Sequence, residues 1–132
     1  MSNQEIKERL LQLTDGLLYI SESDYGVDAE DWGMQDREST LKRISAICNT
    51  EISEVKEQDA ATFFSNTIKA LDPGDELAAT LAGQYRELFA YLLSVCPPIS
   101  VFRAGEIQVQ IFICCYNAEG NCFVLHTTSV ET

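Results

Sequence analysis

Basic residues are scarce in this chain of 132 residues, which contains nine Lys and Arg against 21 Asp and Glu. The resulting formal net charge of -12 repels both a nucleic-acid backbone and an anionic membrane surface. The composition therefore disfavours direct binding of DNA, RNA or membranes. The same charge attracts a basic partner, such as a protein that itself binds nucleic acid, although acidity also simply keeps a domain soluble.

Residues suited to catalysis are also few. His126 is the only histidine, and a catalytic triad, a zinc site or a His-based acid/base pair would have to be built on it. Nothing at a useful spacing supports such a site, so we expect a packed or surface histidine. The chain also contains no glycine-rich phosphate loop and no dinucleotide-binding fingerprint. An enzymatic function is therefore disfavoured.

Metal-binding motifs are absent from the sequence as well. Cys114, Cys115 and Cys122 lack the spacing of a zinc knuckle. The acidic stretch from Glu22 to Glu38 does not place Gly and Glu at the sixth and twelfth positions of a calcium loop. We therefore expect solvated carboxylates and no metal or cofactor belonging to the chain itself. The odd total of five cysteines, including a vicinal pair in an apolar stretch, indicates reduced thiols rather than a disulfide framework.

Long hydrophobic runs are missing too. No stretch approaches the roughly 20 apolar residues of a membrane helix, and the N-terminal residues lack the basic and apolar blocks of a signal peptide. We expect a soluble, cytoplasmic protein that does not contact membranes. The length fits one domain, and 45% hydrophobic with 23% charged residues are ordinary globular values.

Apolar residues recur at spacings of three and four in four segments, which predicts helices over about 2–16, 36–47, 59–70 and 72–96. Ser2 and Glu5 have the spacing of a capping box at the start of the first helix. Asp72 precedes a proline in the first turn of the last and longest helix, where it is expected to act as the N-cap.

Alternating apolar and polar residues predict strands, at about 27–32, 52–57, 99–103, 107–116 and from 122 to the end of the chain. A helical first part followed by a strand meander predicts an α/β fold, with a mixed, largely antiparallel sheet covered by helices. The simplest interpretation of the last strand is an edge strand that stops at Thr132.

Two blocks of the sequence resemble the nuclease A inhibitor family. The first is Asp15-Gly-Leu-Leu-Tyr-Ile-Ser-Glu-Ser-Asp-Tyr25, followed shortly by Trp32. The second consists of Val101-Phe-Arg-Ala-Gly-Glu106 and the closing Val130-Glu-Thr132, and Phe63-Phe-Ser65 lies between the two blocks. The resemblance extends from the first helix to the last residue. It implies a single domain over residues 1–132 with the α/β/α sandwich fold of that family.

The resemblance also implies a function, which is inhibition of a basic, sugar-non-specific, metal-dependent DNA/RNA nuclease of the ββα-metal class. In that family a glutamate of the Ser-Glu-Ser run enters the nuclease active site as a phosphate mimic, and Glu22 matches it. The C-terminal threonine supplies its hydroxyl to the catalytic Mg²⁺ of the nuclease, and Thr132 matches it. Their acidic neighbours Asp24 and Glu131 complete this expected partner-binding surface.

A second family contact is only partly matched. The family carries an Asp-Trp pair before the long helix, which bridges to another metal; Asp72 matches the aspartate, but Pro73 stands in place of the tryptophan. Loss of a tryptophan anchor commonly costs a few kcal/mol of binding free energy. Two hypotheses follow: a bacterial-type cytoplasmic nuclease inhibitor, or an acidic protein-interaction module of the same fold that no longer binds a nuclease.

Overall fold

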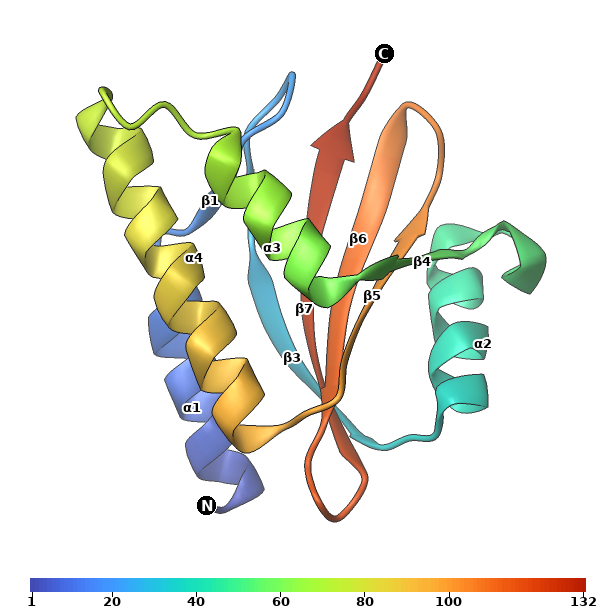
Figure 1. The fold of residues 1–132 in the computed structure, drawn as a ribbon. Coiled ribbons are helices and arrows are strands. Elements are labelled where there is room, and N and C mark those ends of the chain that lie inside the picture. The colour runs from blue at the N-terminus through green and yellow to red at the C-terminus, as the bar shows by residue number, and fades with distance from the viewer.

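The molecule has three layers (Figure 1), as seen in a computed structural model that describes residues 1–132. A five-stranded sheet forms the middle layer. Three helices cover one face of the sheet: α1 (Asn3–Thr14), α3 (Ala60–Lys69) and α4 (Glu76–Val95). The other face is covered by α2 (Arg37–Cys48). This arrangement confirms the predicted α/β/α sandwich.

The central sheet has the spatial order β3-β7-β6-β5-β4. Its strands are β3 (Asp28–Met34), β4 (Lys56–Asp59), β5 (Ile99–Ala104), β6 (Gln108–Tyr116) and β7 (Asn121–Val130). Every neighbouring pair is antiparallel, so the parallel pairing that a mixed sheet would include does not occur. The meander β5-β6-β7 is joined by short turns, which require antiparallel neighbours.

The last strand lies inside the sheet and not at its edge. One side of β7 pairs with β6 from Tyr116↔Cys122 to Gln108↔Val130. The other side pairs with β3, which comes from the first third of the chain. The edge-strand interpretation of the C-terminus is therefore wrong, because a strand distant in sequence occupies the side that the local pattern left open.

Each face of the sheet carries its own core. Alternate residues of β6 face opposite ways, so Ile111 packs with α1, α3 and α4 while Phe112 packs toward α2. The larger core contains 22 buried residues, and the smaller contains seven. The smaller core consists of Trp32, Ile44, Phe102, Phe112, Cys114, Cys122 and Val124. The sheet thus buries apolar side chains on both faces, one under α1, α3 and α4 and the other under α2. None of these helices combines the length and apolar composition needed to cross a bilayer.

The first three long helices begin at side-chain caps, and the cap predicted for the first of them is present. Ser2 and Glu5 form a complete capping box on α1, and Asp36 and Asp59 accept hydrogen bonds at the N-termini of α2 and α3. Near 52–57, however, the predicted strand is replaced by a short 3₁₀ turn, η1 (Ile52–Glu54), and β4 begins only at Lys56.

The start of the long helix differs from the prediction. Asp75, rather than Asp72, is the N-cap of α4 and accepts a hydrogen bond from the Ala78 amide at 3.2 Å. Asp72 instead begins a turn in which its carbonyl accepts from the Asp75 amide and its carboxylate from the Gly74 amide. Pro73 fits the second position of such a turn as well as it fits the first turn of a helix, because both need the same φ.

The cysteine prediction is wrong for one pair. Cys96 at the end of α4 and Cys115 on β6 form a disulfide, with their Cα atoms 5.3 Å apart. They meet because β5, which follows α4, pairs Ile99 with Cys115, a proximity that the cysteine count does not reveal. Cys114 and Cys122 are free and buried in the smaller core, where they pack as small hydrophobic residues as predicted.

Candidate functional site

One end of the sandwich gathers three segments that are far apart in the sequence (Figure 1). They are the C-terminus, the turn between β1 (Leu18–Tyr19) and β2 (Tyr25–Gly26), and the connection from α3 to α4. The N-terminus lies at the opposite end. We refer to residues 21–24 together with residues 130–132 as the acidic tip.

The side chain of Ser21 joins the β1–β2 turn to the last strand. Its hydroxyl accepts a hydrogen bond from the Val130 amide at 3.0 Å and donates one to the Ser23 carbonyl at 2.6 Å. The Glu22 amide in turn donates to the Val130 carbonyl at 3.4 Å. These bonds fix the turn against the end of β7, so the short hairpin is positioned by the large sheet.

The side chains of Glu22 and Thr132 meet at the acidic tip. The Thr132 hydroxyl donates to the Glu22 carboxylate and lies 2.7 Å from both Oε1 and Oε2. Both residues are exposed to solvent. The two residues for which the sequence predicts the most direct contact with a partner, 110 positions apart, therefore share one hydrogen bond.

The residues after β7 are held on a second side as well. The Glu131 amide donates to the Ile107 carbonyl at 2.8 Å, and the Glu131 carboxylate forms an ion pair with Arg103 on β5. Sequence reasoning assigned no role to Ser21 or Arg103. One indication for Arg103 was present in the sequence. It is the only Lys or Arg after Arg86, so it is the only cation in that part of the chain that can pair with a carboxylate there.

The other two predicted contact residues are less constrained. Asp24 lies exposed in the same turn as Glu22, immediately before β2. Asp72 is exposed in the α3–α4 connection, at the same end of the molecule (Figure 1). Its carboxylate is bonded to the Gly74 amide at 2.9 Å and to no group of the acidic tip. Asp72 and Pro73 thus form a separate surface beside the tip.

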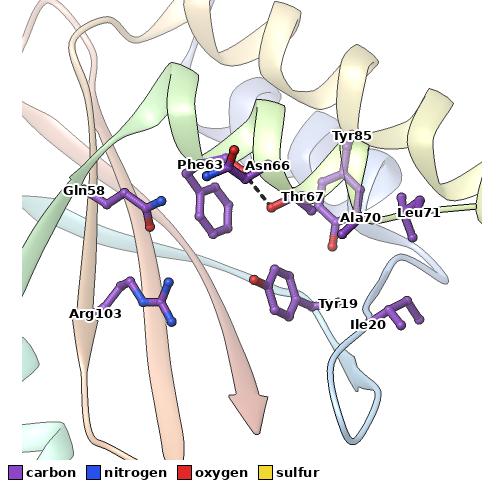
Figure 2. Close-up of a pocket in the computed structure, with 10 residues that line it drawn as sticks. All are labelled: Tyr19, Ile20, Gln58, Phe63, Asn66, Thr67, Ala70, Leu71, Tyr85 and Arg103. Carbon is purple, nitrogen blue, oxygen red and sulfur yellow. Dashed lines mark hydrogen bonds between the residues drawn. The ribbon is translucent and has the colours of Figure 1, made fainter. Parts of the chain in front are cut away.

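A small hollow of about 140 Å³ lies next to the tip, between the hairpin, α3 and β5 (Figure 2). Tyr19, Phe63, Gln58 and Arg103 surround it, and the hydroxyl end of Tyr19 points toward the Arg103 guanidinium. The Gln58 Oε1 atom is buried without a hydrogen-bond partner. A polar hollow of this size accommodates a few water molecules, which would satisfy that oxygen. Glu22 and Thr132 do not line the hollow.

The single histidine is packed, as expected. The His126 ring stacks on Phe112 with centroids 4.3 Å apart, and its Nε2 lies 2.7 Å from the Gln110 Oε1 atom. Burial lowers the pKa of His126 below its ordinary value, and the nearby Glu30 and Asp28 carboxylates only partly oppose this shift. The surroundings therefore favour the neutral ring in the folded protein.

This shift predicts a pH dependence of stability. As pH falls from about 7 to 5.5, the unfolded chain protonates its histidine before the folded chain does, so the free energy of unfolding decreases. We expect urea unfolding to show this decrease in the wild type and a smaller one in His126→Gln. Equal changes in both proteins would contradict the assignment. Carboxylates whose pKa is lowered by helix capping, such as Asp36, titrate below this window.

No group of three or more His, Cys, Asp or Glu side chains is arranged to hold a metal ion. What the acidic tip offers is a carboxylate and a hydroxyl, both exposed and bonded to each other, on a turn that is bonded to the end of β7. Oxygen ligands of this kind suit a hard cation such as Mg²⁺ when it is held by another molecule.

Comparison with known protein families identifies one that covers this chain. A family described as "Nuclease A inhibitor-like protein" matches residues 4–132, nearly the whole chain and both ends of the acidic tip. No match is found among curated proteins.

Proposed function

The chain belongs to the nuclease A inhibitor-like family, and from this premise we propose that it inhibits a sugar-non-specific, metal-dependent nuclease of the ββα-metal class. The acidic tip would enter the nuclease active site, with Glu22 in the place of the scissile phosphate. The Thr132 hydroxyl would approach the catalytic Mg²⁺ of the nuclease. The observation that carries the proposal is the hydrogen bond from Thr132 to Glu22.

That hydrogen bond orients the Thr132 hydroxyl so that its lone pairs remain free for a cation. A hydroxyl has one proton to donate and two lone pairs to offer. Because the proton of Thr132 points at the Glu22 carboxylate, the lone pairs are directed away from it. The oxygen can therefore face a cation without first breaking the bond to Glu22, and the two groups can act together.

Rigid placement supports inhibition by occlusion, which needs no chemistry from the inhibitor. Ser21 bonds the hairpin to Val130, and Glu131 is held by Ile107 and Arg103. A surface ordered before binding loses less conformational entropy when the complex forms. The net charge of -12 would accelerate encounter with the basic groove of a nuclease.

The remaining acidic residues would contribute at the margin of the contact. Asp24 and Glu131 flank the two central groups, and Asp72 would provide a second contact from the α3–α4 connection. Pro73 has much less area to bury than a tryptophan, so this second contact would be weaker. For that reason an acidic interaction module that has lost nuclease binding remains the alternative.

The direct test is inhibition of a ββα-metal nuclease by the intact chain, in Mg²⁺ and with both DNA and RNA as substrates. We expect one-to-one inhibition on both substrates and an association rate that falls as salt is raised, because steering is screened. A ribonuclease without a metal serves as the control and should be unaffected. If the folded protein in excess leaves every ββα-metal nuclease tested fully active, the alternative function is favoured.

A cytoplasmic inhibitor of this kind would protect the cell that makes the nuclease.

A further inference from the structure

We propose that Arg103 is a positioning residue, which aims Thr132 by holding Glu131. This proposal rests on the function proposed above, and it assigns Arg103 a role distinct from nuclease contact. Regular pairing of β7 ends at Val130, so the last two residues need other restraints. The Glu131 amide bond to Ile107 restrains the backbone, and the Arg103 ion pair restrains the side chain.

The strand register explains why Arg103 can reach Glu131. Arg103 is paired with Ile111 of β6, and the end of β7 lies on the far side of β6. Side chains alternate along a strand, so Arg103 shares the face of Val101, which belongs to the larger core. By the same alternation Glu131 shares the face of Leu125, also in that core. Arg103 and Glu131 therefore lie on the same face of the sheet, and the arginine side chain reaches across β6 on that face.

The ion pair is more enclosed than the others in the protein. The Arg103 side chain is 28% exposed, against 42%, 57% and 64% for the cations of the other three pairs. Its side chain lies along the hollow beside Tyr19 and Phe63 (Figure 2). An arginine stem confined by neighbours loses little additional freedom when its guanidinium binds a carboxylate. The pair can therefore fix a geometry, which exposed pairs rarely do.

The positive charge of Arg103 also offsets repulsion between carboxylates of the acidic tip. Glu22 and Glu131 are both part of the acidic tip, and no other Lys or Arg follows Arg86 in the sequence. Without Arg103 the repulsion between the two carboxylates would lose the cation that is bonded to one of them. Glu131 would then move away from Glu22 and take Thr132 with it. Arg103 thus keeps the hydroxyl beside the carboxylate that it bonds.

The test compares Arg103→Ala and Arg103→Lys with Arg9→Ala, which breaks the exposed Arg9–Glu87 pair. We expect Arg103→Ala to raise the inhibition constant about tenfold, Arg103→Lys to recover part of this loss, and Arg9→Ala to change nothing. In a chain that lacks Glu131 and Thr132, Arg103→Ala should cause no further loss. An equal loss in that shortened chain would show that Arg103 acts elsewhere and would overturn the proposal.

A measurement without a nuclease separates this inference from the proposed function. The ¹⁵N NMR order parameter of the Thr132 amide reports motion of the last residue on the picosecond to nanosecond scale. We expect it to fall in Arg103→Ala and to stay unchanged in Arg9→Ala. If it falls while no nuclease is inhibited by the wild type, the positioning role holds and the proposed function fails. If Arg103→Ala leaves it unchanged, the positioning role is wrong.

Discussion

Removal of Glu131 and Thr132 is expected to weaken inhibition of a ββα-metal nuclease by about 100- to 1,000-fold, the range of a central interface anchor. The shortened chain would lose the hydroxyl that we propose to face the metal of the nuclease, and with it the hydrogen bond to Glu22. It would keep its fold, because β7 ends at Val130 and the two deleted residues are exposed. Inhibition titrations together with urea unfolding measure both effects.

Two substitutions at Thr132 provide matched controls for the deletion. Thr132→Val keeps the shape of the side chain and removes its hydroxyl, whereas Thr132→Ser keeps the hydroxyl. We expect Thr132→Val to account for most of the loss and Thr132→Ser to inhibit nearly as well as the wild type. A shortened chain that inhibits as strongly as the intact one would exclude Glu131 and Thr132 as binding residues.

Replacement of Glu22 by Gln is expected to have an effect of similar size. The substitution keeps the shape and one oxygen for the Thr132 hydroxyl, but it removes the charge that would stand in for the phosphate. Loss of one member of a desolvated charge contact costs about 2–5 kcal/mol, or roughly 30- to 4,000-fold in affinity. Inhibition constants measured at two salt concentrations would report the loss and show whether it arises from dissociation or from steering.

The control for Glu22→Gln is Glu119→Gln, which changes the net charge by the same amount. Glu119 lies in the turn between β6 and β7, at the end of the molecule opposite the acidic tip (Figure 1). It should alter only the association rate, and only slightly, because steering depends on the whole charge distribution. Equal losses for the two variants would mean that Glu22 contributes through net charge alone.

Local patterns predicted the parts of the fold that depend on neighbours in sequence. The capping box of Ser2 and Glu5 and the assignment of alternate β6 residues to opposite faces are short-range features, and the structure contains both. The start of α4 was misplaced because a proline suits a turn and a helix start equally well. In that case two local structures compete, and the sequence around Asp72 does not separate them.

Features that depend on contacts between distant segments could not be predicted from local sequence patterns. The inner position of β7 and the Cys96–Cys115 disulfide both follow from how strands pair across the sheet. Glu22 and Thr132 were selected through the family resemblance, and their hydrogen bond appears only once the hairpin is placed beside β7. Arg103 lies in a block that carries the resemblance, but the resemblance assigned it no role, and a single arginine in a strand pattern does not show which carboxylate it will meet.

The inner position of β7 has a mechanical consequence. Between Asn121 and His126, β7 is bonded to β3 on one side and to β6 on the other, so a pull on Thr132 along the strand axis loads two rows of hydrogen bonds there; beyond His126 the strand pairs only with β6. A strand at the edge of a sheet would have only one row of bonds to resist the same pull. We therefore expect a force applied to the acidic tip to be carried by the inner part of the sheet, and the last strand to stay in place when a bound partner moves.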